Sequence, residues 1–463
     1  MKLKLARVPG SITAPRGFAA SGVFCDIKRL GTGKGSEKGQ KRDLALIVSA
    51  VPATVAGTFT TNQVCAAPVK VCAARVRKGS AQAIVVNSGN ANACTGKQGM
   101  EDALEMVHFT EAAVNLPKGS ALVGSTGRIG VSLPMDNVRA GIVEAAATLG
   151  SGADHATRAV EAIMTSDTQA KQIAVEFTLN GQRVRLGGMC KGAGMIQPGM
   201  SATGARPAAR PFHATMLCFL TTDAAVQASP LQAALNEAVA NSFNRITVDG
   251  DMSTNDTVLL LANGMAGRSG SPTFSSQKTG TPSGAKRSDT GVCRPGSTGF
   301  QIFQAALNHV CLELARMIVR DGEGVSRFVT VRVNGARSFA DADAAARAVA
   351  NSALVKTSWH GGDPNWGRII DALGYSQARV VEERVDIGYS APDSRMVLWS
   401  LKRGQSTRAT FKQLCAAVAR KEFDLHINLN VGRGGAVIYA ADLTEAYVEF
   451  NKGDVSDPTS LGG

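Results

Sequence analysis

The sequence predicts a mixed α/β protein, of the α+β kind in which sheets and helices form layers. Apolar runs that fit strands alternate along the chain with stretches of helical spacing. Asn-Gly pairs between strand-like runs favour antiparallel hairpins, so a purely parallel sheet is not expected. Apolar residues make up 44% and charged residues 19% of the 463 residues, which is typical of a globular chain with a large core.

The first half of the chain alternates strands and helices. Residues 81–89 are an apolar run that ends in a polar loop, which predicts a buried strand, and residues 101–114 follow with helical spacing. Residues 120–130 predict a short strand that enters a glycine-rich turn. Two more helices are expected, over residues 136–149 and 155–164.

Hairpins and a second group of elements follow. Residues 172–188 predict a hairpin that turns at Asn180 and the glycine after it, and residues 329–339 predict another that turns at Asn334. The remaining expected elements are helices over residues 342–354 and 411–420 and strands over residues 424–430 and 436–443.

Two stretches look like insertions. Residues 201–213 are rich in Pro, Ala and Arg, and residues 265–299 are rich in Gly, Ser, Thr and Pro. Neither composition can bury much apolar surface, so both stretches are expected to be exposed, mobile loops.

The net charge of +13 is compatible with nucleic-acid binding, with attraction of anionic substrates, or with a solvated basic surface. The basic residues are spread out, and aromatic residues do not interleave with them as in single-strand binders. No apolar run reaches the length of a bilayer span. We therefore expect neither a nucleic-acid partner nor a membrane.

The nine cysteines include no C-x-x-C pair, which argues against a disulfide framework and against a zinc site and favours a reducing compartment. A cytoplasmic location is expected. The basic start, with Lys2, Lys4 and Arg7, leaves the mitochondrial matrix as the alternative.

Familiar hydrolase motifs are missing: the chain has neither G-x-S-x-G nor H-E-x-x-H. Polar, glycine-rich segments instead follow several apolar runs, which is where α/β proteins build sites. These segments are "NSGNANACTG" (87–96), "GSTGRIG" (124–130), "MTSDTQAK" (164–171), "KGAGMIQPGM" (191–200), "ITVDGDMSTND" (246–256), "DGEG" (321–324) and "HGGDPNWGR" (360–368).

Several long motifs, in one order, carry a family resemblance. "KGAGMIQPGM", then "ATMLCFLTTDA", "FNRITVDGDMSTNDTV", "LVKTSWHGGDPNWGRI" and "NLNVGRGGAVIYAADLTEAYVEFN" resemble the ornithine acetyltransferases, the glutamate N-acetyltransferases of the cyclic arginine pathway. The resemblance runs from about Gly17 to Asn451. It implies a layered αββα sandwich of the kind shared with self-cleaving aminopeptidases.

The resemblance implies that the chain cuts itself between Ala214 and Thr215. The products would be an N-terminal chain, residues 1–214, and a C-terminal chain, residues 215–463, held in one body and assembled as an oligomer of such heterodimers. A threonine hydroxyl needs a base, and the freed α-amine, with an ordinary pKa of about 7.7–8.0, can serve as one. Thr203 also follows an alanine, but the continuation "TML-F-TTDA" favours Thr215 as the nucleophile.

Further site residues follow from the same resemblance. Thr126 and Gly127 match the pair that stabilises the oxyanion of acyl transfer. The positions that match substrate-binding residues are Thr165, Lys191, Thr215, Glu323, Asn451 and Ser456. In the segment after "DGEG", Arg327 stands where the family has a lysine-containing run, and a guanidinium is not equivalent to an ammonium.

The expected activity is acetyl transfer by double displacement, from N2-acetylornithine to glutamate through an acetyl-threonine ester. No metal and no cofactor are expected, with acetyl-CoA as an alternative acetyl donor. Two rival functions are a self-cleaving aminopeptidase that passes the acyl group to water, and a noncatalytic basic nucleic-acid-binding protein. Ornithine release with and without glutamate separates the first rival from the transferase, and salt-sensitive nucleic-acid binding would mark the second.

Overall fold

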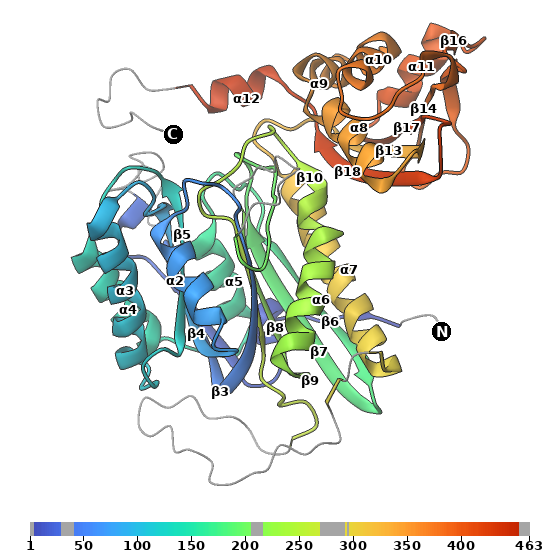
Figure 1. Cartoon of the computed structure of the whole chain (residues 1–463). Helices are drawn as coiled ribbons and strands as arrows, with labels where there is room; N and C mark the ends of the chain where they lie inside the picture. The colour runs from blue at the N-terminus through green and yellow to red at the C-terminus, as the bar shows by residue number, and fades with distance from the viewer. Residues whose placement is uncertain (1–3, 29–40, 205–215, 269–291, 294–295, 453–463) are drawn as a thin grey trace.

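The computed structural model describes residues 4–28, 41–204, 216–268, 292–293 and 296–452. Within these ranges the chain forms a nine-stranded sheet, a seven-stranded sheet and a short two-stranded pair (Figure 1). The nine-stranded sheet and its helices make up the larger, lower part of the molecule in Figure 1. The seven-stranded sheet lies above it and to the right.

The nine-stranded sheet runs in the order β1-β6-β7-β8-β11-β3-β4-β5, with β2 paired to β3. Its strands are β1 (Ala6–Arg7), β2 (Phe18–Val23), β3 (Leu44–Phe59), β4 (Ser80–Asn90), β5 (Ala121–Arg128), β6 (Lys171–Leu179), β7 (Gln182–Lys191), β8 (Leu217–Thr222) and β11 (Thr257–Ala262). The first half of β3 pairs with β2 and the second half with β11. One long strand therefore belongs to both halves of the sheet.

The two halves of this sheet pack face to face. Although β5 and β8 are far apart in strand order, the ring of Phe219 on β8 would lie 3.2 Å from a Cβ added to Gly124 on β5. Alternate residues of β8 also belong to different cores: Leu217 and Phe219 pack with β2–β5, and Cys218 and Leu220 pack with the helices α6 and α7. This period of two is expected for a strand buried on both faces.

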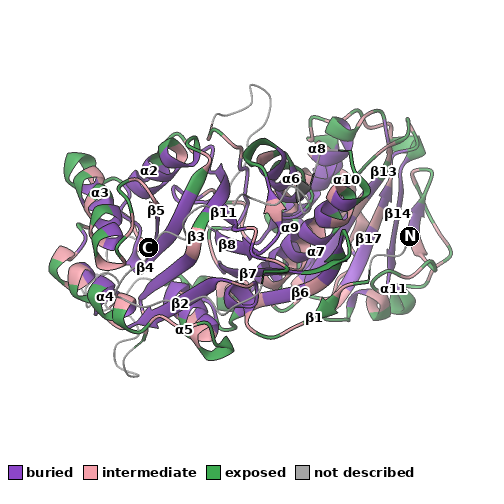
Figure 2. Cartoon of the chain, turned by 90° about the horizontal axis from the view of Figure 1, so that it is seen from below, coloured by how far each residue is buried: buried purple, intermediate pink, exposed green. Residues whose placement is uncertain are grey.

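Helices cover both outer faces, which confirms the predicted mixed α/β class and its layers. The helices against β2–β5 are α2 (Ala67–Val76), α3 (Gly96–Ala113), α4 (Met135–Ala147) and α5 (Ala153–Ile163), and those on the other side are α6 (Ala228–Ala240) and α7 (Thr298–Arg320). In Figure 2 the strands are mostly buried, and exposed residues lie on the outer faces of the helices.

The seven-stranded sheet has the order β10-β18-β13-β17-β14-β15-β16. Its strands are β10 (Ile246–Thr247), β13 (Phe328–Ala336), β14 (Asp386–Ser390), β15 (Leu398–Lys402), β16 (Gln405–Ser406), β17 (Glu422–Asn428) and β18 (Gly434–Ala441). Its helices are α8 (Phe339–Asn351), α9 (Ala353–His360), α10 (Trp366–Gly374) and α11 (Phe411–Val418). The helix α12 (Glu445–Phe450) follows β18 and lies to the left of this sheet in Figure 1. The two-stranded pair is β9 (Ala225–Val226) with β12 (Val292–Cys293).

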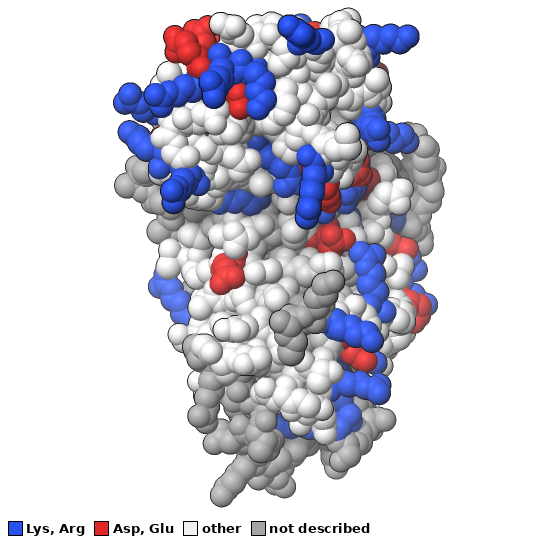
Figure 3. Space-filling model, turned by 90° about the vertical axis from the view of Figure 1, so that its right-hand side faces the viewer, with Lys and Arg blue, Asp and Glu red and all other residues white. Residues whose placement is uncertain are grey.

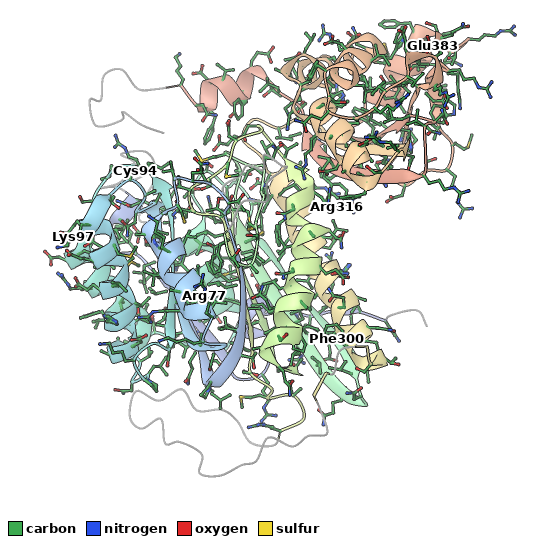
Figure 4. All side chains as sticks on the ribbon, in the orientation of Figure 1. Arg77, Cys94, Lys97, Phe300, Arg316 and Glu383 are labelled. Carbon is green, nitrogen blue, oxygen red and sulfur yellow. The ribbon has the colours of Figure 1, made fainter. Side chains whose placement is uncertain are left out.

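Arg316 of α7 contacts the seven-stranded sheet. Its guanidinium lies over the rings of Phe328 and Tyr439, 5.7 and 5.5 Å from their centres, and Figure 4 labels it where α7 approaches β18. Cation–π contacts of this kind join the two parts of the molecule. On the face drawn in Figure 3, Lys and Arg are most frequent over the upper part, where acidic and uncharged residues interrupt them.

One predicted hairpin is confirmed and the other is wrong. Strands β6 and β7 pair across Asn180 and Gly181, both with positive φ, as a tight two-residue turn requires. Residues 328–336, however, form the single strand β13, which pairs with β17 and β18. Gly335 there lies at a register shift, and Ser338 caps the start of α8, so no second hairpin arm can form.

The predicted insertions lie mostly outside the described residues. Within the second one, residues 292–293 form β12 and residues 298 onward belong to α7, so that prediction placed its end too late. By length and composition alone, α7 is long and apolar enough to cross a bilayer. One face of α7 packs in the core against β6 and β7, and a buried core helix meets the same criteria.

Candidate active site

Three strand ends meet at the site that the sequence predicts. Thr126 lies near the end of β5, Lys191 is the last residue of β7, and Leu217 is the first of β8. Lys191 and Leu217 are paired across the sheet, which places Lys191 beside the start of the strand that follows Thr215. Ala214, Thr215 and Ser456 themselves lie outside the described residues.

Lys191 donates a hydrogen bond to Thr126. Its Nζ lies 3.2 Å from Thr126 Oγ1, and both side chains are buried. An ammonium can only donate, so the threonine oxygen is the acceptor and its own hydrogen stays available for a second acceptor. This geometry suits a hydroxyl that donates to an oxyanion.

The Lys191 ammonium is buried without a salt bridge to any described carboxylate. Burial lowers its pKa, although nearby carboxylates such as Asp167 oppose the shift. A buried cation is costly unless a partner neutralises it, so this position favours an anionic ligand.

Gly127 adopts a backbone conformation that only glycine fits. Its φ is 129°, and a Cβ here would lie 2.3 Å from the carbonyl carbon of Gly89 and 2.5 Å from the backbone nitrogen of Asn90. The absence of a side chain therefore lets β5 approach β4 closely next to Thr126.

Thr165 and Lys191 are connected through Asp167. One oxygen of Asp167 accepts from the Thr165 backbone N–H at 3.0 Å, and the other accepts from the Gly192 N–H at 2.7 Å. Burial opposes ionisation of Asp167, but Lys191 and Lys171 outweigh it and lower its pKa to about 2. Asp167 thus stays ionised and fixes two predicted substrate-binding positions relative to each other.

Glu323 and Asn451, two of the positions expected to bind substrate, are in contact. Asn451 Nδ2 lies 3.1 Å from Glu323 Oε2, which brings the end of α12 to the loop after α7. The Glu323 backbone N–H donates to the carbonyl of Ala193 at 2.9 Å. A Cβ on Gly194 would lie 2.4 Å from the Glu323 carboxyl group, so this glycine gives the carboxylate its space.

Asp256, directly before β11, is a buried carboxyl group that contacts the residue preceding β8. Its Oδ1 accepts from the Met216 backbone N–H, and no donor among the described residues reaches its Oδ2. Burial raises the pKa of Asp256 well above its ordinary value, although the Met216 N–H and Lys191 favour the charged form. A buried carboxyl group therefore lies next to the residue that follows Thr215.

The sequence resemblance missed four acidic and basic residues of this region: Asp167, Lys171, Asp256 and Asp321. All four lie in the polar segments that follow apolar runs, which was the available signal. Their roles depend on contacts between segments that are far apart in sequence, so the segments alone could not assign them.

Arg327 makes hydrogen bonds to backbone carbonyl groups. Its guanidinium donates to the carbonyls of Val418 at 2.9 Å and Arg420 at 3.1 Å, and to that of His360 at 3.5 Å. These contacts tie β13 to the ends of α11 and α9. They leave Arg327 in a structural position.

A Ser, a His and an Asp also meet, just after the Glu323 loop, but not in the order of a hydrolase triad. Ser326 Oγ donates directly to Asp442, and His360 Nδ1 lies 3.1 Å from the same Oγ. In a triad the histidine stands between the other two. Here His360 Nδ1 lies near both Ser326 Oγ and Asp442 Oδ2, at 3.5 Å from the latter, and its Nε2 pairs with Glu445 at 2.8 Å. Among the described residues, no group of three His, Cys, Asp or Glu side chains could hold a metal ion.

Comparison with known proteins gives the family. The ArgJ family model matches residues 22–453. The chain belongs to the ArgJ family. The chain is 44% identical over 444 residues to the arginine biosynthesis bifunctional protein ArgJ of Symbiobacterium thermophilum, covering 96% of this chain and 98% of that protein. It is 39% identical over 447 residues to the glutamate N-acetyltransferase of Methanocaldococcus jannaschii, with the same coverage.

A solved structure is also similar to this ArgJ-family chain. It is the ornithine acetyltransferase of Mycobacterium tuberculosis in complex with ornithine, 36% identical, with a TM-score of 0.38. The match covers 43% of this chain and all of that one.

Proposed function

We propose that this protein is a glutamate N-acetyltransferase of arginine biosynthesis, which transfers the acetyl group of N2-acetylornithine to glutamate. The observation that carries the proposal is the meeting of Thr126, Lys191 and the start of β8 in a chain of the ArgJ family. A hydroxyl donor, a cation that forms no ion pair with a described carboxylate, and the position after the predicted nucleophile are the parts that acyl transfer between amino acids needs.

In the first step the Thr215 Oγ attacks the acetyl carbonyl carbon of N2-acetylornithine. The free amine of Thr215 takes the hydroxyl proton, the C–N bond breaks, and the proton passes to the departing amine of ornithine. In the second step the glutamate amine attacks the acetyl-threonine ester. The C–O bond breaks, Oγ recovers a proton, and N-acetylglutamate leaves.

The described residues support these steps in distinct ways. Thr126 and Gly127 are proposed to stabilise the oxyanion of each tetrahedral intermediate. Lys191 is proposed to bind a substrate carboxylate, and Glu323 an ammonium group. We also propose that Thr165, Asn451 and Ser456 contact the substrate, and that the chain is cleaved between Ala214 and Thr215 and assembles into an oligomer. Acetyl-CoA is proposed as an alternative acetyl donor, and the cytoplasm as the location.

The test is ornithine release from N2-acetylornithine with and without glutamate. We expect rapid release only when glutamate is present, with N-acetylglutamate formed in equal amount. Release at the same rate without glutamate, and free acetate as product, would instead identify a hydrolase. The variant T215A is expected to abolish exchange, since no other hydroxyl replaces the nucleophile.

A further inference from the structure

A buried lysine outside the predicted site joins two carboxylates. Lys171, the first residue of β6, has a side chain only 1% exposed. Its Nζ donates to Asp167 at 2.6 Å and forms a second ion pair with Asp321. Burial opposes the charge, but these two carboxylates outweigh it and raise the pKa of Lys171. Lysine is almost never fully buried unless it is paired in this way.

Asp321, the second partner, organises the loop that contains Thr165. It accepts from the backbone N–H groups of Thr168 and Gln169 at 3.0 and 3.1 Å, and from the Thr168 hydroxyl. It also lies two residues before Glu323. Lys171 therefore connects, through Asp321, the Thr165 loop to the segment that carries the proposed ammonium-binding carboxylate.

Asp167, the first partner, lies between two lysines. It lowers the energy of both charged forms, because it opposes the burial of Lys191 as well as that of Lys171. Yet Asp167 pairs with Lys171, whereas no described carboxylate forms an ion pair with Lys191. Asp167, the carboxylate that most favours the charged form of Lys191, thus already forms an ion pair with Lys171.

We propose that Lys171 is a positioning residue for acyl transfer: it holds Asp167 and Asp321 and so leaves the Lys191 ammonium free for a substrate carboxylate. This inference rests on the proposed function, because it needs a substrate that carries a carboxylate. Without Lys171, the uncompensated Asp167 would attract Lys191, and the substrate would compete with a carboxylate of the protein for the same cation.

The test is steady-state exchange by the full chain bearing K171M. We expect the KM for N2-acetylornithine to rise ~10-fold or more, which corresponds to at least one hydrogen bond to a charged group, while kcat changes less. The matched control is R75M, which also removes a buried base paired to a carboxylate but lies at the far end of β5 from Thr126. R75M should lose thermal stability and keep its KM.

A second variant separates positioning from simple structural support. K171M/D167N also removes the negative charge that competes for Lys191, while the amide that D167N introduces keeps one of the two acceptor oxygens, so the double variant should recover part of the KM increase even if its melting temperature stays low. A double variant no better than K171M, or K171M with an unchanged KM, would overturn the proposal.

If K171M does not fold, K171Q keeps a hydrogen-bond donor without the charge and should raise the KM in the same direction. A folded K171Q with the wild-type KM would also overturn the proposal. Absence of exchange in the wild-type enzyme would instead refute the proposed function. If the wild-type enzyme exchanges the acetyl group and the Lys171 variants keep the wild-type KM, only the role of Lys171 is refuted.

Discussion

A buried basic side chain contacts each end of β5, and the two side chains differ in whether a described carboxylate pairs with them. At the Ala121 end, Arg75 donates to Glu111 and to the Ala121 carbonyl, and Glu111 also accepts from the backbone N–H groups of Gly119 and Ala121. At the Thr126 end, Lys191 has the Thr126 hydroxyl and no ion pair with a described carboxylate.

This difference teaches how to tell a structural charge from a functional one. Proteins rarely bury a charge without pairing it, because desolvation costs more than one neutral hydrogen bond returns. A buried base that already has a carboxylate partner, as Arg75 has in Glu111, needs no charged ligand. A buried base without an ion pair to a described carboxylate, as at Lys191, indicates a group that pairs with a charge only when substrate binds.

Removing Arg75, the base that is paired with a carboxylate, should produce the largest loss of stability. R75M leaves the buried Glu111 carboxylate without its cation, which is expected to cost about 3–5 kcal/mol of unfolding free energy. Chemical denaturation measures this loss, and the exchange assay should show an unchanged KM. A raised KM with normal stability would mean that the two ends of β5 do not differ as described.

Removing Lys191 should have the opposite effect, with a loss of activity and no loss of stability. K191M removes the cation that is proposed to bind the substrate carboxylate. The kcat/KM for exchange should therefore fall ~100-fold, within the range for one preorganised donor. The thermal stability of K191M should equal or exceed that of the wild type, because the variant removes a buried cation that forms no ion pair with a described carboxylate. A K191M protein that exchanges normally but unfolds easily would reverse the assignment.

A third buried lysine sharpens the comparison. Lys356 of α9 donates to the Ala441 carbonyl, and burial lowers its pKa to about 8 despite Asp249 and Asp442. The unfolded chain binds a proton more tightly here, so the penalty is fully present below pH 8 and disappears as pH rises toward 10.5.

K356M should therefore be more stable than the wild type near neutral pH, by about 1 kcal/mol or ~2–4 °C in melting temperature. The gain should vanish by pH 10.5, the ordinary value for lysine. Melting curves across this pH range measure it. An advantage that does not change with pH would show that the charge of Lys356 is not its cause.

Asp256 is expected to give a smaller effect with the reverse pH dependence. Its folded pKa is raised by burial, so the folded state retains a proton that the unfolded state releases, and the cost grows as pH rises above 3.8. D256N keeps an oxygen for the Met216 N–H and should melt higher than the wild type at pH 7. The difference should shrink to nothing near pH 3.8. A destabilised D256N at pH 7 would indicate an ionised Asp256.

Much of the fold could be predicted from the sequence because its signals are local. The run at 81–89 became β4, the helical spacing at 101–114 became most of α3, and the turn at Asn180 formed as expected. The turn at Asn334 was wrong because pairing with β17 and β18 outweighed a local turn signal. Tertiary pairing of that kind cannot be read from one segment.

The candidate site divides in the same way. Motif resemblance located Thr126, Lys191, Glu323 and Asn451, and the structure brings these residues together in two contacting pairs. The role of Lys171 depends on a carboxylate 150 residues away, so no local pattern could reveal it.

The most direct test of the central claim is the intact mass of the purified protein after incubation with N2-acetylornithine alone. The account predicts two fragments, the second beginning at Thr215 and carrying one acetyl group that disappears when glutamate is added. A single uncut chain, or a fragment that never acquires the acetyl group while exchange proceeds, would contradict it.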